Sequence, residues 1–274
     1  FNSQRYSSLF NLKKKLKTFF FNIDVSKPNS LDGFKNVDLI IHCASLTNAE
    51  NSFSNEKEMF KNNLGCMKNV IDYCIKKKSK LIHLSSTSVY GKQAKIVNED
   101  DDSFLKPQSP YADIKLMEEN FLKKNKKKLQ FMSFRFGTIS GISPGMRFHT
   151  AINKFCFNAA LDQKIMVYKT AYNQFRPYLS IKDAFKVFKF CIEKNMFKNE
   201  VFNALSQNLT VKQVVEMIRK YKKNAKIKFV NAKIMNQLSY HVDNKKLNNL
   251  GLKLNSNIER DIKETLKLFV FKNN

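Results

Sequence analysis

The sequence predicts an α/β fold built on a doubly wound parallel sheet, and two observations support this. Short apolar segments alternate along the chain with segments of helical spacing, and parallel strands need such crossovers between them. The strongest apolar segment, VDLIIHCA at 37–44, is nearly continuous, which is typical of a strand covered on both faces. With 274 residues, 43% of them hydrophobic, the chain can form one large domain and a smaller lobe.

The strands are predicted from their apolar runs, and the helices from their spacing and start signals. Apolar residues between Met59 and Ile75 fall largely on one helical face, Pro110 suits a first helical position, and Thr210 suits an N-cap. The predicted strands are Phe19–Asp24, Val37–Ala44, Lys80–Ser85, Leu129–Phe136, Lys164–Tyr168 and Val201–Ala204. The predicted helices are Glu56–Lys77, Pro110–Lys124, Ala151–Leu161, Ile181–Lys194, Val211–Tyr221 and Asn255–Phe271, and 140–145 reads as a loop.

Composition argues against several classes of function. The formal net charge of +26 comes from lysines in short scattered runs, so we favour solvated lysine faces over a nucleic-acid or membrane surface. Five cysteines without a CxxC pair predict buried free thiols in a reducing compartment, and four scattered histidines predict no metal site. No apolar run reaches the roughly 18 residues of a membrane span, so we expect a cytoplasmic protein.

The segment Tyr111-Ala112-Asp113-Ile114-Lys115 carries the strongest chemical signal. A Tyr and a Lys four residues apart share one face of a helix. Phenol is a poor base at neutral pH, but a nearby ammonium favours the phenolate, so the pair can act as a general acid and base. The spacing alone also occurs by chance on surface helices. A run of hydroxyls at 85–88 follows a predicted strand, where Ser86 could hold a substrate oxygen or cap a turn.

Together, Ser85-Ser86-Thr87-Ser88-Val89-Tyr90-Gly91 and Ser109-Pro110-Tyr111 with Lys115 resemble the extended short-chain dehydrogenase/reductases. This is a family of nucleotide-sugar epimerases, dehydratases and decarboxylases, and the resemblance covers almost the whole chain. It implies a Rossmann-like NAD-binding domain at 1–138 and a mainly substrate-binding lobe at 139–274, with 176–204 returning to the sheet. It also implies NAD as cofactor, a nucleoside-diphosphate sugar as substrate, and a homodimer.

The resemblance assigns roles residue by residue. Tyr111, Lys115 and Ser86 match the catalytic groups. The cofactor positions are Asp24, Val25, Cys43, Ala44, Ser45, Asn62, Tyr111, Lys115 and Phe136, of which Asn62 is expected to steady the central strands. The substrate positions are Thr87, Thr138 and Arg176, the last matching an arginine that holds the diphosphate. Arg147, His149 and Tyr168 are further substrate candidates for which a surface or packing role is an equal alternative.

The chain departs from the family pattern at two places, one in the cofactor site and one in the substrate site. The first glycine is Gly33, so no glycine-rich phosphate loop is found, and we expect a fragment of a longer gene product that lacks the first strand and that loop. As written, the chain is expected to bind dinucleotide poorly. Many members carry a second phosphate-binding arginine near position 234, where this chain offers Lys233.

The residues after Ser86 narrow the chemistry. Dehydratases of the family place an Asp-Glu pair next and decarboxylases a Glu, whereas this chain has Thr87 and Ser88, which cannot do carboxylate work. This favours a 4-epimerase that passes through a transient keto sugar. An NAD(P)H-dependent ketoreductase or a dehydratase of the same family remains an alternative. A catalytically inactive binding protein that uses its basic surface is an alternative of another class.

Overall fold

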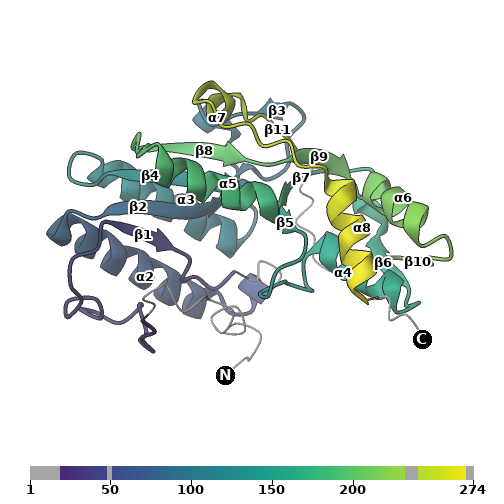
Figure 1. Cartoon of the computed structure of the whole chain (residues 1–274), viewed down its shortest axis with the longest axis horizontal. Coiled ribbons are helices and arrows are strands. Elements are labelled where there is room, and N and C mark those ends of the chain that lie inside the picture. The colour runs from purple at the N-terminus through teal and green to yellow at the C-terminus, as the bar shows by residue number, and fades with distance from the viewer. Residues whose placement is uncertain (1–18, 48–50, 232–239, 270–274) are drawn as a thin grey trace.

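The computed structural model describes residues 19–47, 51–231 and 240–269. Its centre is a parallel sheet formed by β1 (Leu39–His42), β2 (Lys80–Ser86), β4 (Phe131–Phe136) and β8 (Glu200–Ala204). The strands lie in the order β1-β2-β4-β8 (Figure 1). Because all four run the same way, their carboxyl ends meet at one edge of the sheet. The predicted parallel sheet is therefore confirmed.

Helices cover both faces of this sheet (Figure 1), as apolar parallel strands require. On one face, α2 (Glu56–Lys77) and α3 (Pro110–Asn125) pack through Met67 and Leu122 onto Phe131. On the other face, α5 (Ile181–Glu193) packs through Val187 onto Met132. The strands β2, β4 and β8 thus bury most of their side chains, whereas β1 is only partly covered.

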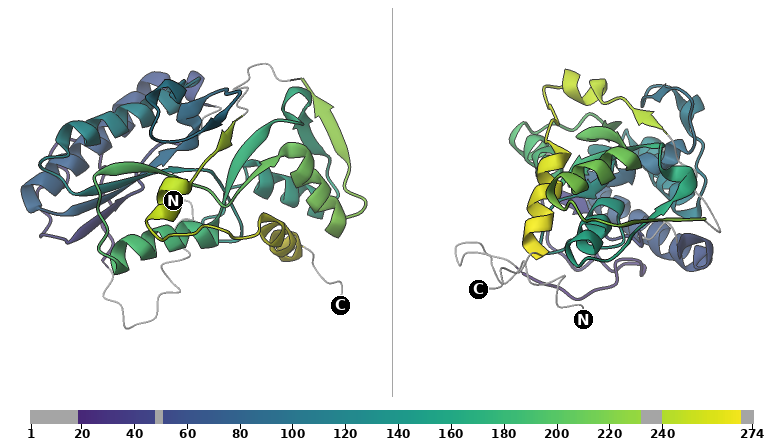
Figure 2. Two further views of the ribbon diagram at one scale, coloured as in Figure 1. Left: turned by 90° about the horizontal axis from the view of Figure 1, so that it is seen from above. Right: turned by 90° about the vertical axis from the view of Figure 1, so that its right-hand side faces the viewer.

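The rest of the chain forms a second body of elements beside the sheet (Figure 2). Its core lies between three helices, α4 (Ala151–Ala160), α6 (Val211–Tyr221) and α8 (Ile258–Phe269), and three small sheets complete it or join it to the first body. These sheets are β5-β7-β9 (Thr138–Ser140, Phe175–Ser180, Gln207–Thr210), β10-β6 (Ile227–Val230, Ile165–Tyr168) and β11-β3 (His241–Val242, Ile96–Val97). The short elements are η1 (Asn51–Phe53), η2 (Thr87–Tyr90), η3 (Asp102–Phe104), η4 (Lys169–Ala171) and α7 (Lys245–Asn249).

Most predicted elements are confirmed to within a few residues, and Thr210 caps α6 through a capping box with Gln213. One prediction is wrong: Phe19–Asp24 forms no strand. Its side chains are largely exposed, and it pairs with no strand of the described sheets. The predicted strand at 37–44 shortens to β1 for the same reason, because pairing ends at His42.

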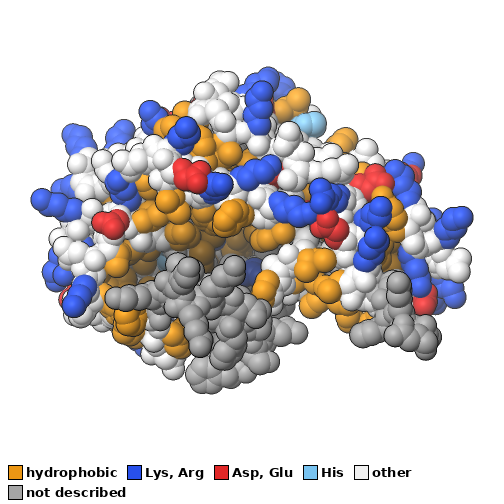
Figure 3. Space-filling view, viewed as in Figure 1, with side chains coloured by type: hydrophobic (Ala, Val, Ile, Leu, Met, Phe, Trp, Pro, Cys, Tyr) orange, Lys and Arg blue, Asp and Glu red, His pale blue; other side chains and the backbone are white. Residues whose placement is uncertain are grey.

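The structure bears on the composition-based expectations at a few points. None of the described helices is long and apolar enough to cross a membrane. Lys and Arg side chains are spread over the visible face in Figure 3. All five cysteines are free thiols, but Cys43 is exposed rather than buried, which corrects the expectation for that residue. It follows the last paired residue of β1, where the chain leaves the core.

Candidate active site

The predicted catalytic residues meet at the carboxyl edge of the central sheet. β2 ends at Ser86 on this edge, and α3 returns the chain toward the start of β4, so its first turn lies at the same edge. The Ser109 hydroxyl accepts a hydrogen bond from the amide of Ala112 (3.2 Å), and Pro110 occupies the first turn. Ser109 and Pro110 thus set the start of α3 and place Tyr111 in its first turn.

Tyr111 and Lys115 form the pair that the spacing predicts. The Lys115 Nζ atom lies 5.9 Å from the centroid of the Tyr111 ring, and the lysine is 4% exposed. Burial lowers the pKa of Lys115, but the Glu118 carboxylate and Tyr111 outweigh it, so the net pKa is raised. A buried, charged ammonium next to a phenol is an arrangement suited to proton transfer.

The hydroxyl run after β2 forms a tight turn rather than a free array of donors. Ser86 accepts a hydrogen bond from the amide of Ser88 (3.2 Å), so its side chain also caps η2. Buried Thr87 donates to the carbonyl of Phe136 (3.3 Å). The hydroxyl of Tyr240 donates to Thr87 (3.4 Å), which brings a residue 153 positions away into the site.

Arg176 on β7 is a half-buried cation without a carboxylate partner among the described residues that contact it. Its Nη2 atom donates to Gln174 (3.3 Å), and its buried Nη1 atom has no hydrogen-bond partner among the described residues. Burial lowers the pKa of Arg176, and its charge acts on the phenols of Tyr178 and Tyr240. An arginine in this state suits an oxyanion ligand, because its planar fork matches phosphate oxygens.

Tyr240 interacts electrostatically with Arg176 and with Tyr111 on α3, and no local pattern in the sequence indicated this residue. Burial raises the pKa of the Tyr240 phenol, the Arg176 guanidinium opposes this, and Tyr111 adds to it. These three side chains therefore lie within electrostatic range of one another. The Tyr178 hydroxyl, buried nearby, has no hydrogen-bond partner among the described residues.

The cofactor positions lie around β1 and the loop after it. Cys43, Ala44 and Ser45 follow β1 at the carboxyl edge. Asp24 is exposed and accepts hydrogen bonds from the backbone amide and the hydroxyl of Ser26 (3.0 and 2.6 Å). Val25 is half-buried against α2 and α3, and Phe136 ends β4 in the core.

The buried Asn63 ties this loop to α2. Its side chain accepts from the amide of Leu46 (2.7 Å) and donates to the carbonyl of Leu46 (3.0 Å). The half-buried Asn62 donates to the side chain of Asn63 (2.9 Å), and its role in steadying the central strands stays a prediction.

The remaining substrate candidates separate into two groups. Arg147 donates to the hydroxyl of Thr47 (2.7 Å) in the loop after β1, so it lies beside the cofactor positions. Thr138 begins β5 next to Phe136, and His149 is exposed at the end of the same loop as Arg147. Tyr168 lies in the separate β10-β6 sheet and is 41% exposed. Lys233 lies outside the described residues.

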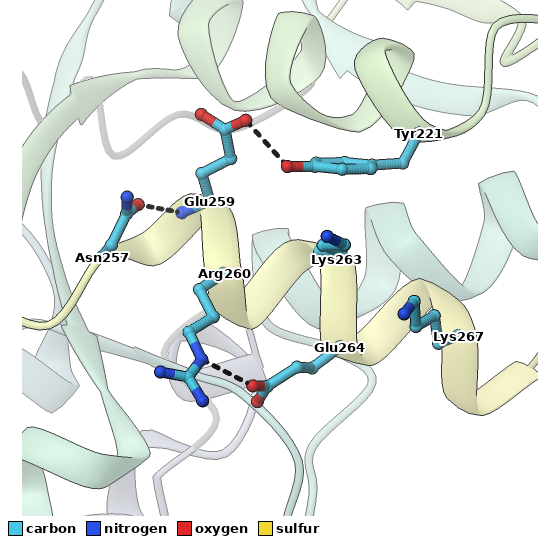
Figure 4. Close-up of a pocket in the computed structure, with 7 residues that line it drawn as sticks. All are labelled: Tyr221, Asn257, Glu259, Arg260, Lys263, Glu264 and Lys267. Atoms are coloured by element: carbon cyan, nitrogen blue, oxygen red, sulfur yellow. Dashed lines mark hydrogen bonds and ion pairs between the residues drawn. The ribbon is translucent and has the colours of Figure 1, made fainter.

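A surface pocket of about 480 Å³ lies away from these residues, between the end of α6 and one side of α8 (Figure 4). Its acids are already paired: Glu259 accepts from Tyr221 (2.9 Å), and Glu264 accepts from Arg260 (2.8 Å). The described residues hold no group of three or more acidic, His or Cys side chains that could bind a metal. The carboxyl edge is therefore the candidate active site.

The described residues fit one half of a dinucleotide. The Tyr111–Lys115 pair and the 43–45 turn border the edge where nicotinamide and its ribose would lie. The buried Nε2 atom of His42, at the end of β1, has no hydrogen-bond partner among the described residues and could bind a polar ligand. None of the described segments forms the glycine-rich turn that holds a pyrophosphate at a helix N-terminus.

A doubly wound parallel sheet with a Tyr–Lys pair at its carboxyl edge defines a Rossmann-like protein of the dehydrogenase/reductase type. The model of the NAD dependent epimerase/dehydratase family matches residues 2–204, and the chain belongs to this family.

Known proteins similar to this chain span several activities. A trifunctional UDP-glucose 4,6-dehydratase/UDP-4-keto-6-deoxy-D-glucose 3,5-epimerase/UDP-4-keto-L-rhamnose-reductase of Arabidopsis thaliana is 26% identical over 85% of this chain, which spans only 36% of that relative. Among solved structures, UDP-glucose 4-epimerase of Thermus thermophilus in complex with NAD has a TM-score of 0.78 at 17% identity, covering 95% of this chain and 86% of that chain. RMD of Pseudomonas aeruginosa with NADPH has a TM-score of 0.80 at 18% identity, covering 97% and 94%. At such identities the structural likeness shows the fold alone.

Proposed function

We propose that the protein is an NAD-dependent nucleotide-sugar epimerase of the 4-epimerase type. The observation that carries this proposal is the set of groups around Tyr240. That residue interacts electrostatically with the half-buried Arg176, whose Nη1 atom has no hydrogen-bond partner among the described residues, and with Tyr111 on α3. Its hydroxyl donates to Thr87 in the turn after β2. The arginine suits the diphosphate of a nucleotide sugar, and the phenol of Tyr111 suits a sugar hydroxyl.

In the proposed mechanism, Tyr111 takes the proton from a sugar hydroxyl and later returns it. Lys115 keeps a positive charge beside the phenol, at 5.9 Å from its ring. The Ser86 hydroxyl holds the sugar oxygen, and Arg176 binds the diphosphate. Lys115 and the 43–45 turn would hold the nicotinamide half of NAD, which would supply the exchange of hydride with the sugar carbon.

Epimerisation is favoured over dehydration by the side chain that follows Ser86. Thr87 is buried and donates its hydroxyl to the carbonyl of Phe136, so no carboxylate stands there to move a second proton. A hydroxyl cannot act as a carboxylate base at neutral pH. In this proposal the only proton exchanged with the sugar passes through Tyr111.

The proposal is tested by incubating the protein with NAD and a panel of UDP- and dTDP-sugars and identifying the products by NMR. We expect the 4-epimer without net reduction of NAD, and a keto sugar that accumulates would instead identify a dehydratase. Tyr111→Phe should abolish turnover. Tyr221→Phe is the matched control, because it removes a surface phenol that bonds only Glu259 among the contacts described for its hydroxyl.

A ketoreductase is the second candidate, favoured by the similarity to the trifunctional Arabidopsis relative, whose name includes a UDP-4-keto-L-rhamnose-reductase. The two activities differ in their use of cofactor, because a reductase consumes one NAD(P)H for each product and an epimerase regenerates its cofactor. Stoichiometric loss of NAD(P)H absorbance with a keto-sugar substrate would favour the reductase.

A further inference from the structure

The catalytic lysine is held by a buried acid that the proposed mechanism does not use. Lys115 Nζ donates to Glu118 Oε2 at 2.8 Å, one helical turn along α3. Both side chains are almost completely shielded from solvent, with 5% and 0% exposure. A charged lysine at such a site needs a partner of opposite charge, because desolvation otherwise favours its neutral form.

The carboxylate is itself fixed by the sheet. His83 on β2 contacts the same Glu118 oxygen through Nε2 at 3.0 Å, and its Nδ1 atom contacts the Ser133 hydroxyl on β4 at 2.8 Å. A tautomer with the proton on Nε2 satisfies both contacts, with the serine hydroxyl donating to Nδ1. The acid therefore cannot follow the lysine if the lysine moves, and the chain Ser133–His83–Glu118 anchors the ammonium to two strands.

We propose that Glu118 is a positioning residue for Lys115, holding it charged and in place beside Tyr111. This inference rests on the proposed function, because it assigns the acid a role in the proton transfer at that site. The groups that face the ammonium agree with this assignment. Of the titratable groups around Lys115, Glu118 is the one hydrogen-bonded to it. The others are Tyr111 on α3, His42 on β1, Cys43 in the loop after β1, His83 on β2 and Cys66 on α2.

The buried Lys115–Glu118 pair differs from an ordinary surface ion pair in the effect that its loss would have on the charge of the lysine. Removing the charge of Glu118 leaves a buried ammonium beside one phenol, two histidines and two thiols, none of which is an anion at neutral pH in its ordinary state. The lysine should then lose its proton at lower pH. Turnover, which needs the ammonium, should be lost over the same range.

The test is Glu118→Gln in the full chain, with Glu118→Asp as the conservative variant. Glu216→Gln is the control, since that acid belongs to an exposed pair with Lys212 on α6 at 4.0 Å. The first readout is the ionisation of Lys115, followed by NMR with lysine labelled at the ε-carbon and assigned with Lys115→Arg. We expect the titration of Lys115 to move down by roughly one to three pH units in Glu118→Gln, and by less in Glu118→Asp.

The second readout is the pH profile of kcat, whose alkaline limb should move down by the same amount as the NMR titration while KM changes little. An unchanged Lys115 titration in Glu118→Gln overturns the inference, and so does a shift equal to that of Glu216→Gln. If the wild-type chain turns over no nucleotide sugar, the proposed function fails while the NMR titration still decides the role of Glu118.

Discussion

Replacing Glu119 by Gln should remove about 3–5 kcal/mol from the free energy of unfolding. The Glu119 carboxylate binds Arg135 in a bidentate pair, with Nε to Oε1 at 2.9 Å and Nη2 to Oε2 at 2.7 Å. Arg135 and Glu119 are 1% and 0% exposed, and the Ser85 hydroxyl also donates to the acid at 2.5 Å. Glutamine keeps the size and one acceptor oxygen but loses the negative charge, so the buried guanidinium is left with neutral partners such as the hydroxyl of Tyr90 at 2.8 Å.

The magnitude follows from the chemistry of arginine. A guanidinium cannot shed its proton in a protein, so the variant must keep an uncompensated charge in the core or open the structure to water. Urea denaturation followed by far-UV circular dichroism measures the change by linear extrapolation. At about 2–4 °C for each kcal/mol, the melting temperature should fall by roughly 6–20 °C.

Two further variants make this expectation refutable. Glu193→Gln breaks an exposed pair with Lys189, 3.7 Å long and more than half exposed on both sides, and should cost less than about 0.5 kcal/mol. The double variant Glu119→Leu/Arg135→Met should recover much of the loss, because no unpaired charge remains. If Glu119→Gln cost less than about 1 kcal/mol, the reasoning from buried charge would be wrong.

Three other predictions concern local structure. Gly91→Ala should destabilise the protein by about 1–3 kcal/mol more than Gly251→Ala in urea titrations, because both have positive φ but only at Gly91 would a Cβ overlap a backbone carbonyl. Burial lowers the pKa of the His42 imidazole from 6.5 to about 3, so the unfolded state binds a proton that the folded state does not. Stability should therefore fall from pH 6.5 toward pH 3, by up to about 1.4 kcal/mol per pH unit. In His42→Phe the urea midpoint should depend less on pH over that range. Thr210→Ala removes a capping box and should cost about 0.5–2 kcal/mol in the same assay, more than Thr150→Ala, whose side chain makes no cap bond.

The sequence was sufficient for the sheet and for most helices because their signals are local. Apolar runs and helical spacing predicted all four strands of the central sheet and the limits of α2. Phe19–Asp24 failed because an apolar run describes what a strand can bury and not whether a neighbouring strand is present to pair with it. Pairing is a property of the fold, and the strands β3, β5, β7, β9, β10 and β11 escaped prediction for the same reason.

The residues of the site also differ in whether local sequence signals could predict them. The Tyr111–Lys115 pair could be found because both residues lie on one helix at a fixed spacing. Tyr240 could not, since its contact with Thr87 spans 153 positions. Glu118 and Glu119 were missed for another reason: charged residues in a helix are ordinarily solvent-exposed, and here both are fully buried on the face that carries Lys115.

These two adjacent carboxylates should differ in how their loss depends on pH. Glu118 neutralises a lysine, which can escape an unpaired buried state by giving up its proton, and Glu119 neutralises an arginine, which cannot. Deprotonating a lysine costs about 1.4 kcal/mol for each pH unit below its ordinary pKa of about 10.4. The penalty of Glu118→Gln is therefore capped at about 2 kcal/mol near pH 9 and grows toward neutral pH, whereas the penalty of Glu119→Gln should stay constant.

Urea titrations of both variants between roughly pH 7 and pH 9 measure this difference. A penalty that shrinks with pH for Glu118→Gln alone would show that the lysine and not the helix responds to the missing charge. Equal pH dependence in the two variants would contradict the separate pairing, because the carboxylates would then share one electrostatic environment. Separate pairing lets a single helix face supply a proton-transfer group that can change its charge and a structural cation that cannot.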